Sequence, residues 1–148
     1  MQELNLPAYP FKIRKRTDGA TEILDPVRNK YIILTPEEWV RQHFVQFMIS
    51  EGGLPAGRIA IEYSIELNRM ARRCDAVYFD QEGKPQLIVE CKRPTVAITQ
   101  ETFDQIARYN LELKVPYLVV TNGLDHYYCT LDHEAKRYRF LRSFPDLK

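Results

Sequence analysis

Three charged residues in the middle of the chain have side-chain types and a spacing that suit catalysis. In a strand from Leu87 to Lys92 alternate side chains share a face, so Glu90 and Lys92 project from the same side. A hairpin turn centred between positions 82 and 83 pairs residues whose numbers add to 165, which places Asp75 directly opposite Glu90. Such partners have Cβ atoms about 4.5–5.5 Å apart. The sequence therefore predicts two carboxylates and an amine close together on one sheet face.

Two carboxylates facing each other across neighbouring strands repel, so this pair does not favour the stability of a sheet. A divalent cation between them removes the repulsion, and Mg²⁺ commonly takes one or two carboxylates together with water and substrate phosphate. We therefore expect Asp75 and Glu90 to bind Mg²⁺, with Mn²⁺ as a substitute, and Lys92 to assist the hydrolysis of a phosphodiester. The alternative is a solvated charged face on which Lys92 only neutralises Glu90.

A helix predicted over Thr99–Leu113 adds two polar side chains after these strands. Gln105 and Tyr109 are four residues apart and lie on one stripe of that helix. The stripe borders the apolar face that includes Phe103 and Ile106. An amide and a phenol at this edge are suited to contact a nucleotide or to position a water molecule. A partly buried tyrosine with a polar neighbour is the competing interpretation.

Basic side chains cluster in three parts of the sequence. Those nearest the two carboxylates are placed to contact phosphates on either side of a cleaved bond, and they are Arg69, Arg72, Arg73 and Arg93. A second cluster comprises Lys12, Arg14, Lys15 and Arg16, and a third Lys136, Arg137, Arg139 and Arg142. Each cluster can also be explained as solvated surface, and we favour that explanation for the third.

The elements around these residues predict a mixed α/β domain, with helices packed on a central sheet. Alternating patterns in residues 11–16 and 21–24, joined by Asp18-Gly19, predict an N-terminal β-hairpin. Thr35, followed by Pro36 and by Glu38 three positions later, is typical of a helix start with a capping box. Further strands are expected at residues 59–65, 74–79, 87–91, 117–121, 126–131 and 137–141.

The charges of the chain are nearly balanced, with 21 Lys and Arg against 20 Asp and Glu in 148 residues, a net charge of +1. This excludes a polycation that binds nucleic acid through bulk charge alone. No apolar run approaches the roughly 20 residues that span a bilayer, so we expect no membrane-spanning helix. The first residues show no signal-peptide pattern, and the three widely spaced cysteines are typical of reduced thiols. We expect a cytoplasmic protein without membrane association.

The ordered motifs resemble those of the PD-(D/E)XK nuclease superfamily. Asp75, Glu90-Cys91-Lys92 and the pair Gln105 and Tyr109 match its D…ExK and QxxxY pattern. More narrowly, the chain is similar to the N-terminal nuclease domain of type I restriction enzyme R subunits, in a small stand-alone form. This similarity covers roughly residues 25–131 and includes the runs 35–42, 89–94 and 121–123.

The resemblance implies a restriction-endonuclease-like fold over residues 35–148, with residues 1–34 as an N-terminal extension and hairpin packed on it. It also implies a restriction-modification endonuclease, a hydrolase that cleaves DNA with Mg²⁺. By this likeness Asp75 and Glu90 are metal ligands, Lys92 is the catalytic lysine, and the QxxxY pair is auxiliary. Family members often add a glutamate before the sheet, for which Glu38 and Glu62 are both candidates. The capping box explains Glu38 equally well.

R subunits normally carry a helicase motor after the nuclease domain. A chain of 148 residues has no room for one, and it lacks a G-x-x-x-x-G-K-[ST] loop. We therefore expect any helicase or translocase to be a partner, such as another restriction-modification subunit. Two other hypotheses are a non-catalytic DNA-binding module with the same fold, and an assembly subunit whose edge strand pairs with a second copy in a homodimer.

Overall fold

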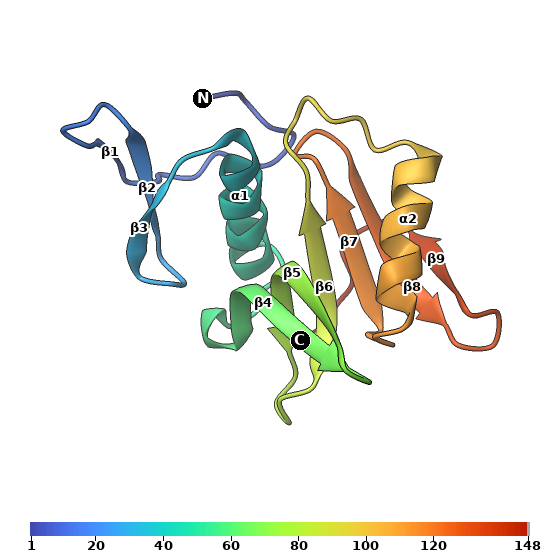
Figure 1. The fold of residues 1–148 in the computed structure, drawn as a ribbon. Helices are drawn as coiled ribbons and strands as arrows, with labels where there is room; N and C mark the ends of the chain where they lie inside the picture. The colour runs from blue at the N-terminus through green and yellow to red at the C-terminus, as the bar shows by residue number, and fades with distance from the viewer. Residues whose placement is uncertain (148) are drawn as a thin grey trace.

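The computed structural model describes residues 1–147, apart from the side chain of Met70, and has an α/β architecture (Figure 1). Its helices are α1 (Pro36–Ser50) and α2 (Gln100–Leu111), with a 3₁₀ turn η1 (Ala56–Arg58). The strands are β1 (Ile13–Lys15), β2 (Thr21–Asp25), β3 (Lys30–Ile33), β4 (Ile59–Leu67), β5 (Met70–Phe79), β6 (Pro85–Cys91), β7 (Tyr117–Thr121), β8 (His126–Asp132) and β9 (Arg137–Leu141).

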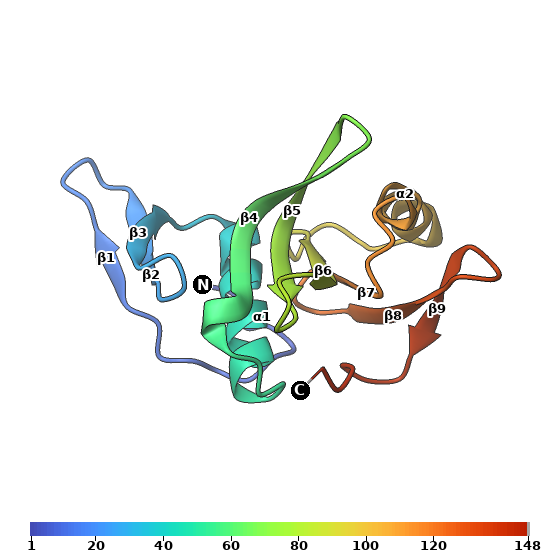
Figure 2. The same ribbon diagram turned by 90° about the horizontal axis from the view of Figure 1, so that it is seen from below.

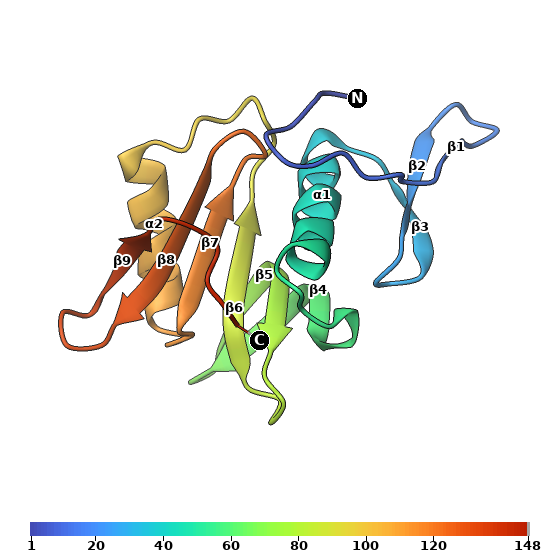
Figure 3. The same ribbon diagram turned by 180° about the vertical axis from the view of Figure 1, so that it is seen from behind.

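The larger sheet has the strand order β4-β5-β6-β7-β8-β9. The pair β6 and β7 is parallel and the other neighbouring pairs are antiparallel, so the sheet is mixed. Helix α2 makes the crossover between β6 and β7, whereas α1 covers the opposite face (Figures 1 and 3). This arrangement confirms the predicted restriction-endonuclease-like fold.

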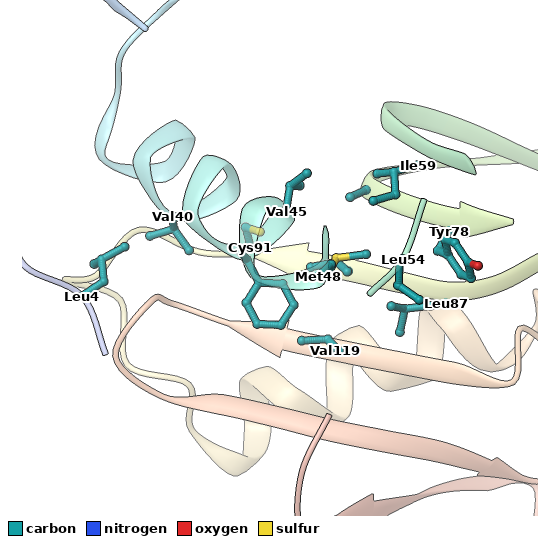
Figure 4. Close-up of a cluster of buried hydrophobic side chains, with 13 residues drawn as sticks. Leu4, Val40, Val45, Met48, Leu54, Ile59, Tyr78, Leu87, Cys91 and Val119 are labelled. Carbon is teal, nitrogen blue, oxygen red and sulfur yellow. The ribbon is translucent and has the colours of Figure 1, made fainter. Parts of the chain in front are cut away.

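Alternate residues of the central strands supply two hydrophobic layers. On one face Val40, Phe44 and Met48 of α1 pack against Leu87 and Val89 of β6. Figure 4 shows Val40, Met48 and Leu87 in this layer. On the other face α2 packs through Phe103 and Ile106, against a layer that includes Val77, Ile88 and Val120. Full burial of one such side chain contributes roughly 1.5–3 kcal/mol relative to exposure. The two layers therefore fix the positions of both helices on the strands that carry the charged residues.

The predicted N-terminal hairpin forms, and β3 extends it to an antiparallel sheet of order β1-β2-β3. Gly19 lies in the β1–β2 turn with φ +89°, a left-handed conformation that glycine adopts without steric cost. This smaller sheet is separate from the larger one and stands beside α1 (Figures 1 and 2). Phe11 packs on Trp39 and His43 of α1, with ring centroids 5.7 and 4.8 Å apart.

The predicted start of α1 is confirmed. Thr35 is the N-cap, and its hydroxyl accepts a hydrogen bond from the backbone N–H of Glu38 at 3.0 Å. The three cysteines are free and buried. Neither α1 nor α2 is long and apolar enough to cross a membrane, and no other candidate span occurs within residues 1–147.

Candidate active site

Asp75 and Glu90 lie one residue beyond the paired part of β5 and β6, and Lys92 directly follows β6. The predicted register is confirmed at three pairs, Ala76↔Val89, Val77↔Ile88 and Tyr78↔Leu87. Continued by one step, this register sets Asp75 beside Glu90. Asp75 Oδ2 accepts a hydrogen bond from the backbone N–H of Cys91 at 2.7 Å, which ties its carboxylate to the end of β6. The backbone N–H of Lys92 bonds to β7 and holds this residue directly after the strand.

The two carboxylates lie at the level where β5 separates from β6. Residues 70–74 of β5 pair only with β4, whereas residues 76–78 pair with both β4 and β6, and the β4–β5 hairpin projects from the sheet (Figure 2). Opposite Asp75 on β4, Glu62 has φ +52°, a left-handed conformation that is rare for a residue within a strand. Such backbone strain costs on the order of 1–3 kcal/mol and is concentrated at functional sites.

Both carboxylates resist ionisation. Burial raises the pKa of Glu90 to about 8, and the charge of Asp75 adds to this effect, while Arg72 and Lys92 oppose it. Burial also raises the pKa of Asp75, against the hydrogen bond from Cys91 and the nearby positive charges. Burial thus opposes the ionisation of both acids more strongly than the nearby positive charges favour it.

One oxygen of this pair is unsatisfied. Glu90 Oε1 is buried without a hydrogen-bond partner among the described residues, and Arg72 Nη2 lies 3.6 Å away as a long ion pair. Within residues 1–147 no three His, Cys, Asp or Glu residues form a group that could hold a metal ion. Two carboxylates with water and phosphate are, however, a typical ligand set of Mg²⁺. The donors at this position therefore fit that ion.

Arg41 of α1 connects Asp75 to the two further glutamates. Its guanidinium lies 3.2 Å from Asp75 Oδ1 and 3.1 Å from Glu62 Oε1, and it also hydrogen-bonds to Glu38. Other contacts come to Glu38 from Gln42 (2.9 Å) and Arg28 (3.3 Å), and to Glu62 from Arg73 (2.7 Å) and Arg28 (3.4 Å). Arginines thus engage the carboxylates of both Glu38 and Glu62.

Glu37, the residue before Glu38, has an exposed side chain whose charge interacts with that of Asp75, and its sequence position alone does not single it out. Its partial burial raises its pKa and the charge of Asp75 adds to this, while the charges of Arg41 and Lys92 oppose it. Adjacent residues differ by about 100° around a helix, so only one of the two glutamates faces inward. Glu38 and Arg41 are three residues apart, a spacing at which side chains of a helix can pair. This spacing indicates from the sequence that Glu38, and not Glu37, forms the internal ion pair.

The predicted auxiliary helix reaches the site through an arginine. The Arg72 guanidinium lies over the Tyr109 ring, 5.0 Å from its centroid, and forms the long ion pair with Glu90. Arg72 and Tyr109 also line a pocket of about 460 Å³ whose apolar walls include Leu67 and Leu113. Tyr109 is therefore placed near the carboxylates, with a cationic group between them.

The other predicted DNA contacts have different surroundings. Gln105 is exposed on the same stripe of α2 as Tyr109, and both line a second pocket of about 620 Å³. Arg73 turns toward β4 and pairs with Glu62, whereas Arg93 is exposed beyond the end of β6. The structure thus pairs Glu90 with Arg72, joins Asp75 to Arg41 and to the backbone of Cys91, and leaves Gln105 and Arg93 exposed.

A comparison with known protein families matches residues 36–145 to the family described as type I restriction enzyme R protein N terminus (HSDR_N). The matched range covers most of the chain, with both helices and every strand of the larger sheet. It leaves out the smaller sheet. No curated protein matches the chain. The chain therefore belongs to the family of type I restriction enzyme R protein N-terminal domains.

Proposed function

We propose that this domain is a Mg²⁺-dependent DNA endonuclease of the PD-(D/E)XK type. The observation that carries the proposal is the adjacent pair of Asp75 and Glu90, in which burial raises the pKa of each carboxyl and the buried Glu90 Oε1 has no hydrogen-bond partner among the described residues. A folded protein tolerates such a pair poorly without a cation, and a site for chemistry explains why it is present. Family membership supports a role in restriction of DNA.

In this proposal Asp75 and Glu90 hold Mg²⁺, with Mn²⁺ as a substitute. When bound, the ion supplies positive charge that polarises the scissile phosphate and activates water. Lys92, whose positive charge lowers the pKa of both carboxyls, orients the phosphate or the attacking water. Arg72, held over Tyr109, contacts a neighbouring phosphate, while Arg73, Arg93 and Gln105 extend the DNA contact outward.

Cleavage of linear and circular DNA in Mg²⁺, Mn²⁺ or EDTA tests this function. Lys92→Ala and Asp75→Asn are expected to lower the rate at least 100-fold, in the range that acid–base and electrostatic groups contribute. Lys84→Ala, which removes an exposed lysine from the β5–β6 turn, is the matched control and is expected to cleave normally. Metal-dependent cleavage that survives in Lys92→Ala would show that the assigned mechanism is wrong.

A specific contact supports the second candidate, a non-catalytic DNA-binding module. Arg41 already places a positive charge 3.2 Å from Asp75 without a metal ion. A domain that only binds DNA would show salt-sensitive affinity and no cleavage in any divalent cation. In either case, a helicase or translocase of a restriction-modification system is the partner that family membership favours. A homodimer through the edge strand β4 or β9 is the third alternative, which gel filtration tests.

A further inference from the structure

The smaller sheet carries a basic surface that the proposed cleavage chemistry does not use. Residues 11–34 contain six basic and three acidic side chains, a net charge of +3, whereas the whole chain has +1. This segment also lies outside the range matched to the restriction-enzyme family. Positive charge is therefore concentrated in an element that accompanies the family domain.

Strand pairing places three of these basic side chains in one row. Backbone hydrogen bonds join Lys12 to Leu24 and Arg16 to Ala20, so the β1–β2 pairing continues on both sides of Arg14. Because alternate residues of a strand share a face, Lys12, Arg14 and Arg16 project from the same side. All three are exposed.

The row is held in place but only partly neutralised. Arg14 lies over the ring of Tyr31, 3.6 Å from its centroid, and pairs with Glu22 at 2.9 Å. Arg16 pairs with Asp18 in the exposed turn at 3.2 Å. Lys12, Lys15 and Lys30 form no ion pair within residues 1–147 and are exposed, so they leave an excess of positive charge on the sheet.

The sheet is attached to the candidate active site. Arg28, in the β2–β3 turn, lies 3.3 Å from Glu38 and 3.4 Å from Glu62. Both glutamates bind Arg41, which contacts Asp75. Figures 1 and 2 show the sheet beside α1, on the side away from α2. A duplex lying across the carboxylates thus has a basic sheet on one flank.

We propose that the row formed by Lys12, Arg14 and Arg16 binds the phosphate backbone of double-stranded DNA next to the cleavage site. The choice of DNA as the ligand rests on the proposed nuclease function. Contacts to phosphates fix the position of a duplex without reading its sequence. The row would therefore increase affinity for all duplexes and hold them against α1 and β4.

The test measures binding of the full chain to a fluorescent duplex in EDTA, where cleavage cannot occur, over a series of NaCl concentrations. The variant Lys12→Gln/Arg14→Gln/Arg16→Gln removes the row. The matched control is Lys136→Gln/Arg137→Gln/Arg139→Gln, which removes three exposed charges from the β8–β9 end. Circular dichroism and thermal melts check that both variants fold.

If all three side chains contact phosphates, the negative slope of log K against log [NaCl] becomes shallower by about 2.7 in the row variant. The control should keep the slope and affinity of the natural chain. Equal losses in both variants, or no loss in either, would overturn the proposal. Binding is measured without metal and so does not depend on cleavage. If the row variant loses affinity but the natural chain does not cleave DNA, only the nuclease function is refuted. Cleavage and DNA affinity unchanged in the row variant would refute only the row.

Discussion

At the scale of single residues, the unusual group is Glu90, a carboxyl whose pKa is raised to about 8 by burial and by Asp75. Its ordinary pKa is 4.5. Between these values the folded protein keeps a proton that the unfolded chain loses. The unfolding free energy therefore falls as pH rises through this window and becomes constant above it. The two carboxyls interact closely, so the pair titrates together.

We expect the metal-free protein to lose stability, on the order of a few kcal/mol, between pH 5 and pH 8.5. Urea denaturation in EDTA at several pH values measures this loss. Glu90→Gln cannot ionise and should remove most of the pH dependence, while Glu82→Gln in the exposed β5–β6 turn should leave it intact. An equally steep loss in Glu90→Gln would contradict the assigned pKa.

At the scale of elements, Arg41 joins α1 to both β4 and β5. It is buried, with a side-chain exposure of 9%, and bonds to Glu38, Glu62 and Asp75. Burial alone would lower its pKa, but the hydrogen bond and charge of Glu38 together with the charge of Asp75 raise it, so it stays cationic. Without it, the buried carboxylate of Glu38 loses its closest positive partner.

Arg41→Ala is expected to destabilise the protein by about 3–5 kcal/mol, the cost of removing one partner of a buried ion pair. Arg41→Lys should recover part of this loss, because an ammonium restores the charge but not the planar donors. The exposed substitution Arg139→Ala is the control and should change stability by less than about 0.5 kcal/mol. A loss below about 1 kcal/mol in Arg41→Ala, measured by urea denaturation, would show that the network is not structurally important.

The elements were predictable where local signals suffice. The Thr35 cap and the β5–β6 register follow from short-range patterns, and the structure confirms them. The register holds even though the ladder shifts between Tyr78 and Phe79, because that shift is confined to the turn. The structure adds β3 to the predicted hairpin. Its four residues form too short a pattern to predict either the strand or the strand with which it pairs.

The candidate site was predictable only along the strand pair that carries it. Spacing places Asp75 beside Glu90, but the departure of β5 from β6 depends on β4 and on the backbone conformation of Glu62. The pairing of Glu38 with Arg28 brings in a residue of the smaller sheet. Such contacts join residues that are distant in sequence, so no local pattern specifies them.

At the scale of the whole molecule, a net charge of +1 conceals an uneven distribution. The smaller sheet and its flanks carry +3, so the rest of the chain is net negative, and its acids include the buried pair. A cation at Asp75 and Glu90 would reduce the repulsion of DNA from this region. We therefore expect DNA affinity to rise when a divalent cation is added and to fall steeply with salt.

In the proposed function, Asp75 and Glu90 together hold a divalent cation. Calorimetric titration of Mn²⁺ into the natural chain, Asp75→Asn, Glu90→Gln and the exposed-turn control Glu82→Gln measures this binding. Saturable binding is expected in the natural chain and in Glu82→Gln, and is expected to be lost in both site variants. Binding that is unchanged in Asp75→Asn and Glu90→Gln, or no binding to the natural chain, would show that this pair does not hold the ion.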